Sequence, residues 1–315
     1  MVRFSLNLGT KIQRELTGRP CRISLGDSHC FPVTRRPTGA PCATRPQFLE
    51  WSKTVVRSQR RAGAGTMRLQ HKIAIVTGAA QGIGRSAALR FAKEGALVVV
   101  ADSQDKVAET AKEITDAGGS SCSIVMDTTK ADQWDKTVAF ALENYGRIDL
   151  LANIAGVVAL DGPDTVIGLT EERWAHVVGT DLTGVWLGMR AVIPTMIESG
   201  GGRICNVASM AALRGLPNLA AYSAAKGGVA ALTRQAAIEY AADNILVNAV
   251  APGTINTPIL AGVEPEHLEQ FAAAHAINRL GDPGEVAAMM VHFFSEDGNF
   301  LTGQLFPVCG GWSVK

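Results

Sequence analysis

Ile73-Ala-Ile-Val-Thr77-Gly78-Ala-Ala-Gln-Gly82-Ile83-Gly84 is the most informative stretch of this 315-residue chain. Its first five residues form a short apolar run, which predicts a strand buried on both faces. The glycines that follow predict a tight turn into a helix, where the backbone can approach a pyrophosphate. The spacing G-x-x-x-G-x-G is one residue longer than the general dinucleotide-binding spacing. Taken alone, the stretch indicates either a dinucleotide-binding turn or a strand–helix turn without a ligand.

From Lys72 onward, similar apolar runs alternate with amphipathic stretches. The apolar runs predict strands at Ile73–Thr77, Leu97–Ala101, Ser123–Met126, Ile148–Ala152, Arg203–Val207, Ile245–Val250 and Gln304–Val308. The amphipathic stretches predict helices that include Gly82–Glu94, Lys106–Ala117, Asp132–Tyr145, Glu171–Glu198 and Tyr222–Ala241. Continuous Val, Ile and Leu runs are typical of parallel strands covered by helices. The pattern predicts an α/β fold, a Rossmann-like doubly wound parallel sheet forming a single domain over 67–315, with ligands beyond the carboxyl ends of the strands.

The composition excludes several classes of protein. Hydrophobic residues make up 47% of the chain, which is enough for a sizeable core, but no apolar run approaches the roughly 20 residues that cross a bilayer. The six cysteines show no C-x-x-C spacing, so we expect a reduced compartment, the cytoplasm, and not a disulfide scaffold. No His/Cys cluster has metal-binding spacing, and we expect no metal.

Residues 1–66 differ in charge from the rest of the chain. They contain 12 Lys/Arg and three Asp/Glu, a net charge of +9, whereas the remainder has a net charge of −8. An acidic body disfavours nucleic-acid binding. The leader has no helical or strand period, so we expect it to be disordered. We favour an extension upstream of a natural start at Met67. A transit peptide to the mitochondrial matrix is the next alternative, and a basic arm for nucleic acid or membranes is the third.

Two acidic residues follow predicted strands. Asp102 comes 18 residues after Gly84, and a carboxylate there can bind an adenosine ribose and repel a 2′-phosphate. The structural alternative is a helix cap, for which Ser103 competes. Asp127 follows the third strand and offers an acceptor to an adenine amino group, or simply ends the strand.

Tyr222-Ser-Ala-Ala-Lys226 places a phenol and an ammonium one turn apart on a predicted helix. An ammonium stabilises a phenolate and lowers its pKa, so such a tyrosine can exchange a proton with an alcohol or a carbonyl. A Tyr–Lys pair at this spacing is also common on a solvated helix face. Ser209 ends a predicted buried strand and could donate a hydrogen bond to the same substrate oxygen, or only terminate that strand.

Together these motifs resemble the short-chain dehydrogenase/reductase family from about Lys72 to Ser313. The matching segments are Thr77-Gly78-x-x-x-Gly82-Ile83-Gly84, Ser209, Tyr222-x-x-x-Lys226, Pro252–Thr257, Thr302-Gly303-Gln304 and Gly310-Gly311. The resemblance implies that Tyr222 is the general acid/base, that Lys226 lowers its pKa and holds the nicotinamide ribose, and that Ser209 orients the substrate. It implies cofactor contacts at Gly78, Gly82, Ile83, Gly84, Asp102, Asp127, Asn153, Ala155, Gly156, Tyr222, Lys226, Pro252, Gly253, Ile255 and Thr257.

Two positions depart from the family pattern. The family's Asn-Asn-Ala-Gly is Asn153-Ile154-Ala155-Gly156 here, and we expect the backbone contact with the cofactor to survive. Asp181 occupies the place of the family's fourth catalytic residue, an asparagine that kinks its helix. The proton relay is therefore either retained through the main-chain carbonyl or altered by the carboxylate.

The resemblance implies NAD-dependent oxidation of a secondary alcohol, or the reverse reduction of a ketone, without a metal. It also implies a homodimer or homotetramer associated through helices Glu171–Glu198 and Tyr222–Ala241. The substrate pocket is expected along 157–170, 211–219 and 258–277, whose apolar residues suggest an apolar, cyclic substrate. The alternative is a dinucleotide-binding redox sensor or scaffold that has lost turnover.

Overall fold

The computed structural model describes residues 67–158, 162 and 164–315, and all of these belong to one compact unit. The predictions for the leader, residues 1–66, lie outside the described residues. The boundary at Met67 stays a prediction.

Seven parallel strands form one sheet in the order β3-β2-β1-β4-β5-β6-β7. The strands are β1 (Ile73–Thr77), β2 (Leu97–Asp102), β3 (Ser120–Val125), β4 (Leu150–Asn153), β5 (Gly202–Val207), β6 (Ile245–Pro252) and β7 (Leu305–Val308). The strand order reverses between β1 and β4, and this switch opens a crevice beyond their carboxyl ends. The predicted doubly wound sheet is confirmed.

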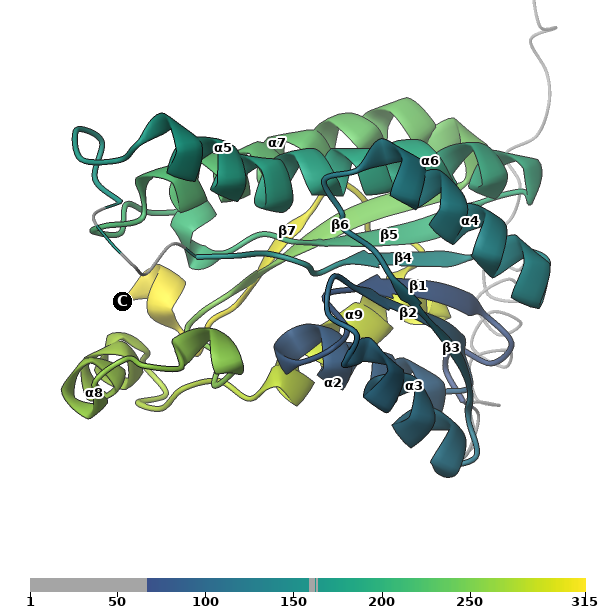
Figure 1. Cartoon of the computed structure of the whole chain (residues 1–315), viewed down its shortest axis with the longest axis horizontal. Helices are drawn as coiled ribbons and strands as arrows, with labels where there is room; N and C mark the ends of the chain where they lie inside the picture. The colour runs from purple at the N-terminus through teal and green to yellow at the C-terminus, as the bar shows by residue number, and fades with distance from the viewer. Residues whose placement is uncertain (1–66, 159–161, 163) are drawn as a thin grey trace, which may run out of the picture. The chain divides into compact units, whose positions relative to one another are not determined.

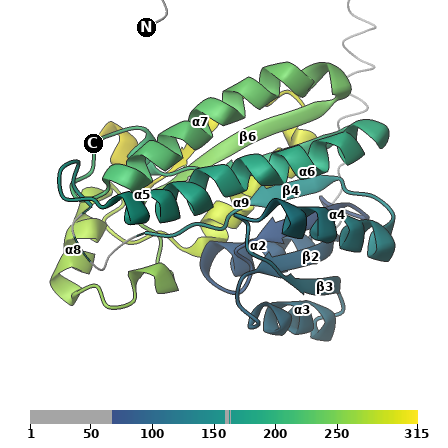
Figure 2. The ribbon, with the colours of Figure 1, turned by 45° about the horizontal axis from the view of Figure 1, so that its top comes forward.

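Helices cover both faces of the sheet (Figures 1 and 2). One layer contains α2 (Gly82–Lys93), α3 (Val107–Asp116) and α9 (Pro283–Phe294), and the other contains α4 (Ala131–Tyr145), α5 (Glu171–Val178), α6 (Gly184–Glu198) and α7 (Ala220–Tyr240). The short helix α8 (Pro265–Ala274) lies beyond the carboxyl ends of the strands. No helix in the described part of the chain is long and apolar enough to span a membrane.

The central strand β1 supplies side chains to two separate cores. Ala74 and Val76 belong to the core under α2, α3 and α9, whereas Ile75 between them belongs to the core under α4, α6 and α7. This alternation is the two-residue period of a strand. Phe91 and Phe294 meet edge to face in the first core, and Trp134 is buried in the second. Burial on both faces fixes the register of the strand and the position of the glycine turn after it.

The predicted helix over Glu171–Glu198 differs in detail from the structure. A π-helical turn, Gly179–Thr183, joins α5 to α6, and Asp181 lies in its middle. A single extra residue in a helix turns the following side chains to a new direction and is frequent at functional sites. Helices α8 and α9 were not predicted from the sequence.

Candidate active site

The glycines of the turn between β1 and α2 allow other groups to come close to its backbone. Gly78 and Gly82 have φ of +66° and +54°, in the region that favours glycine. A Cβ on Gly84 would lie 2.0 Å from the carbonyl oxygen of Gly78, so only glycine fits there. Ile83, between these glycines, packs against the core below.

The amino end of α2 suits an anionic group. The helix has no side-chain cap and no acidic residue in its first turn, so its N–H groups and the positive end of its dipole are available. A cavity of about 540 Å³ adjoins it, with Gly82, Lys106 and Asn256 among its lining. The free N–H groups at the start of α2 and the glycine backbone fit the pyrophosphate of a dinucleotide cofactor, and the cavity is also lined by the carboxylates of Glu109, Glu113 and Asp282.

Asp102 ends β2 and is buried against the turn. One carboxylate oxygen accepts the N–H of Ala80 at 3.0 Å, and the other accepts the N–H of Gln104 at 3.0 Å. Asp102 is therefore not the cap of α3, whose N-cap is Lys106. Asp127, after β3, accepts the N–H and the hydroxyl of Thr129 at 2.8 and 2.7 Å. Both acids lie at the carboxyl ends of their strands, as expected. Each accepts hydrogen bonds from nearby backbone N–H groups.

The end of β4 is tied to the end of β1 by Thr77. Its hydroxyl oxygen accepts the N–H groups of Ile154 at 2.9 Å and Ala155 at 3.2 Å. A Cβ on Gly78 would lie 2.9 Å from the nitrogen of Ala155, so the two segments touch through their backbones. Thr77 was quoted in the sequence motif but not among the site residues. The sequence feature that could have identified it is a hydroxyl side chain at the end of a strand, directly before Gly78.

The side chain of Asn153 points into the protein interior. Its amide donates to the side chain of Asn206 on β5 at 2.9 Å, and it is almost fully buried. In turn, the Asn206 amide donates to the hydroxyl of Thr233 on α7 at 3.0 Å. This network joins β4, β5 and α7 beneath the site. A cofactor contact by Asn153 would use its backbone.

Ser209, Tyr222 and Lys226 come together beyond the end of β5. Tyr222 and Lys226 lie one turn apart on α7, and the Lys226 nitrogen is 5.5 Å from the centre of the Tyr222 ring. Ser209 lies close enough to Tyr222 to favour its ionised form, and the Ser209 hydroxyl oxygen accepts the N–H of Ala211 at 3.1 Å. The buried ammonium of Lys226 donates to the carbonyl of Val207 at 3.0 Å. The pair is thus not a solvated helix face.

Asp181 joins this group through a buried ion pair. One carboxylate oxygen lies 3.0 Å from the Lys226 nitrogen, and the other accepts the N–H of Val157 at 2.8 Å. Asp181 is fully buried. A Cβ on Gly156 would lie 3.0 Å from Asp181 and 3.2 Å from Lys226, so Gly156 gives the pair its room.

Burial and charge shift the pKa values of these groups. Burial raises the pKa of Tyr222. The Lys226 ammonium and the nearby Ser209 hydroxyl oppose this, whereas the Asp181 carboxylate adds to it. Burial also raises the pKa of Asp181, against the attraction of Lys226. For Lys226, burial is the largest effect and disfavours the ammonium, but Asp181 and Tyr222 together outweigh it and raise the pKa. Asp181 therefore holds Lys226 charged and makes Tyr222 harder to ionise.

The segment after β6 closes the site from the other side. Gly253 donates its N–H to the carbonyl of Val308 at 3.0 Å, and the buried Ile255 pairs with Gly281. A Cβ on Gly82 would lie 3.3 Å from the Cβ of Thr257, so this segment reaches the glycine turn. Pro252, the last residue of β6, starts it.

The described residues contain no group of three His, Cys, Asp or Glu side chains arranged to hold a metal ion. The metal-free chemistry expected from the sequence stays a prediction.

Residues 78–313 match the family model described as enoyl-(acyl carrier protein) reductase. The 2,5-dichloro-2,5-cyclohexadiene-1,4-diol dehydrogenase of Sphingobium indicum is 36% identical over 248 residues, covering 78% of this chain and 98% of that protein. The chain belongs to the short-chain dehydrogenase/reductase family. A second member, the cyclohexanol dehydrogenase of Acinetobacter sp., is 36% identical over 249 residues, covering 79% of this chain and 97% of that protein.

Solved structures of the short-chain dehydrogenase/reductase family share the fold. One is described as an NAD(P)-dependent gluconate 5-dehydrogenase from Beutenbergia cavernae, with NADP bound at low occupancy. It has 34% sequence identity and a TM-score of 0.75, and the match covers 80% of this chain and 100% of that one. The chain is an oxidoreductase that transfers a hydride between a nicotinamide dinucleotide and a secondary alcohol or ketone. The named relatives lend no support to a sensor without turnover.

Proposed function

We propose that the chain is an NAD-dependent dehydrogenase of apolar, cyclic secondary alcohols, with Tyr222 as its general acid/base. The observation that carries this proposal is the contact group of Ser209, Tyr222 and Lys226 beyond the end of β5. It lies at the same edge of the sheet as the glycine turn.

The chain's own residues supply the proton chemistry. Tyr222 takes the proton of the substrate hydroxyl as the alcohol is oxidised and returns it during ketone reduction. Ser209 holds the substrate oxygen toward the phenol, and the Lys226 ammonium stabilises the phenolate. A nicotinamide bound there would supply the hydride acceptor for oxidation and the hydride donor for reduction.

Preference for NAD over NADP is supported by Asp102. Its buried carboxylate lies against the glycine turn at the end of β2. A ribose hydroxyl could donate to it, whereas a 2′-phosphate would meet a like charge.

The substrate class is supported by the expected pocket segments and by the relatives. Leu213, Ile259 and Phe271 are partly exposed apolar side chains on these segments. The named relatives include dehydrogenases of a chlorinated cyclohexadienediol and of cyclohexanol, and another is a cis-4-hydroxycyclohexanecarboxylate dehydrogenase. A six-membered carbocycle with one secondary hydroxyl group is the natural first substrate to test.

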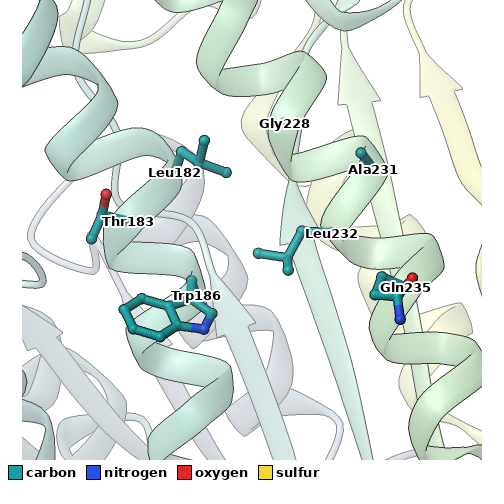
Figure 3. Close-up of a pocket in the computed structure, with 7 residues that line it drawn as sticks. All are labelled: Leu182, Thr183, Trp186, Gly228, Ala231, Leu232 and Gln235. Carbon is teal, nitrogen blue, oxygen red and sulfur yellow. The ribbon is translucent and has the colours of Figure 1, made fainter. Parts of the chain in front are cut away.

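Self-association is supported by an apolar groove along α7 and the start of α6 (Figure 3). The groove measures about 540 Å³ and is lined by Leu182, Thr183, Trp186, Gly228, Ala231, Leu232 and Gln235. The lining is mostly apolar, and the large side chain of Trp186 within it is 44% exposed in a single copy of the chain. We infer that a second copy of the chain covers this groove, giving a homodimer or homotetramer.

The test is oxidation of cyclohexanol and related cyclic alcohols with NAD, followed by absorbance of NADH. Tyr222→Phe keeps the ring but removes the transferable proton, so we expect turnover to fall by roughly 10²–10⁴-fold with NADH binding retained. Tyr240→Phe, at the far end of the same helix, is the matched control and should stay near wild type. Near-wild-type turnover of Tyr222→Phe would remove Tyr222 from the mechanism.

A further inference from the structure

His275 links three segments around the active site. It follows α8 directly, and its Nε2 accepts the N–H of Thr254 at 3.1 Å. Its ring meets that of Trp312 edge to face, with 5.3 Å between the ring centres. A Cβ on Gly310, whose φ is +53°, would lie 3.3 Å from the Cβ of His275. The segment after β6, the exit of α8 and the carboxyl-terminal segment therefore meet at one imidazole.

The contact with the segment after β6 is unusually close. A Cβ on Gly253 would lie 2.5 Å from the Nε2 of His275, so the ring rests directly on the glycine backbone. Gly253 is also fixed by its N–H bond to Val308. An imidazole on one side and a strand on the other leave this backbone little freedom.

The hydrogen bond also fixes the state of the ring. Because Nε2 accepts a hydrogen, it carries no proton, and the neutral ring must carry its hydrogen on Nδ1. His275 is 2% exposed, and its Nδ1 has no hydrogen-bond partner among the described residues. An apolar side chain would avoid this unpaired group, so packing alone does not account for a histidine here.

We propose that His275 is a positioning residue, which holds the Gly253–Thr254 backbone in place for the nicotinamide end of the cofactor. The inference rests on the proposed cofactor role of the Pro252–Thr257 segment. It adds that cofactor affinity depends on a residue from the substrate side of the site. His275 acts through the Thr254 amide and takes no part in proton transfer.

The test compares two variants in the full chain. His275→Phe keeps a ring against Trp312 but removes the acceptor, and we expect the dissociation constant of NADH to rise about tenfold. Turnover at saturating cofactor should change by less than about threefold, because Tyr222, Lys226 and Ser209 are untouched. His275→Gln places a carbonyl oxygen near the position of Nε2 and should restore most of the affinity. His292→Phe, on α9, is the matched control and should bind NADH normally.

The outcomes separate this inference from the proposed function. If His275→Phe and His275→Gln are folded and bind NADH like wild type, the positioning role is overturned, and a lowered melting temperature alone would then mark a structural role. Equal loss of affinity in both variants would also overturn it. If the Phe variant does not fold, the smaller His275→Leu takes its place, and its affinity for NADH is compared with that of His275→Gln. A wild-type chain that binds neither NADH nor NADPH would overturn the proposed function, and this inference with it.

Discussion

Asp181 brings a negative charge into the interior beside the proposed catalytic tyrosine. Its carboxylate pairs with Lys226 at 3.0 Å and is fully buried. An asparagine there would leave the lysine ammonium as the nearest charge to Tyr222. The aspartate cancels part of that field and contributes to the raised pKa of the phenol. In the proposed mechanism, a higher pH is therefore needed to form the Tyr222 phenolate that takes the proton of the alcohol.

Replacing Asp181 by asparagine should lower the apparent pKa that governs kcat/KM for alcohol oxidation. The substitution removes the carboxylate that raises the Tyr222 pKa, and we expect the profile to shift toward acid. The measurement is the pH–rate profile at fixed ionic strength. The apparent pKa belongs to the coupled group of Tyr222, Lys226 and Asp181, so the profiles of the two proteins are compared as wholes.

The same substitution leaves Lys226 as a buried cation without its counter-ion. Breaking a buried pair in this way costs about 3–5 kcal/mol, so the folded fraction is measured beside the rate. An apparent pKa that is unchanged or higher in folded Asp181→Asn would contradict the electrostatic role and leave Asp181 as a structural substitution.

Asp102 should control the choice of cofactor. Asp102→Asn removes the charge with little change in shape, and we expect the ratio of kcat/KM for NAD over NADP to fall about tenfold. Asp105→Asn, three residues further on and exposed, is the control for net charge. The comparison uses initial rates with both cofactors. A wild-type preference for NADP would refute the assignment.

Some site residues were predictable from the sequence because their relation is local. The spacing of Tyr222 and Lys226 on one helix predicted their proximity, and the structure has it. The partners of His275 and Asn153 come from distant segments, and no local period marks them. The effect of Asp181 was left open between two alternatives for the same reason, since the distance of its carboxylate from Lys226 depends on how two helices pack.

The elements themselves followed from the sequence to different degrees. The inner strands were predicted to within two residues at each end, because burial on both faces gives apolar runs. The edge strand β3 begins at Ser120, three residues before the predicted start, because its side chains are only partly buried and its polar residues hide the pattern. The residues of the π-helical turn at Gly179–Thr183 are ones that also occur in α-helices. The hydrophobic pattern therefore did not reveal its extra residue.

Helix α9 should depend on its amino-terminal cap. The Asp282 carboxylate accepts the N–H of Gly284 at 2.7 Å, and the Glu285 carboxylate accepts the N–H of Asp282 at 2.8 Å. Asp282→Ala should lower the free energy of unfolding by about 1 kcal/mol, whereas Asp282→Asn retains an acceptor and should lose less. Urea unfolding measures both. Equal stability of the Ala variant and wild type would show that packing of α9 against α2 holds this end without the cap.

At the scale of the whole molecule, residues 67–315 should fold and act without the leader. Both described cores are built from residues after Met67. A protein that starts at Met67 should keep its melting temperature within about 2 °C and its kcat/KM within about twofold. Insoluble or inactive protein would show that residues 1–66 contribute to the fold. Fusion of residues 1–66 to a fluorescent protein distinguishes mitochondrial import from retention in the cytoplasm.

The central position of β1 has a consequence for synthesis on the ribosome. β1 pairs with β2 soon after it emerges, but its other neighbour, β4, begins only at Leu150. At about 5–20 residues per second, one edge of this interior strand waits on the order of 4–15 seconds for its partner. During that interval an apolar strand edge is open to pairing with other nascent chains. Slower translation lengthens this exposure, so the yield of native enzyme should depend on chaperone supply more than its final stability would suggest.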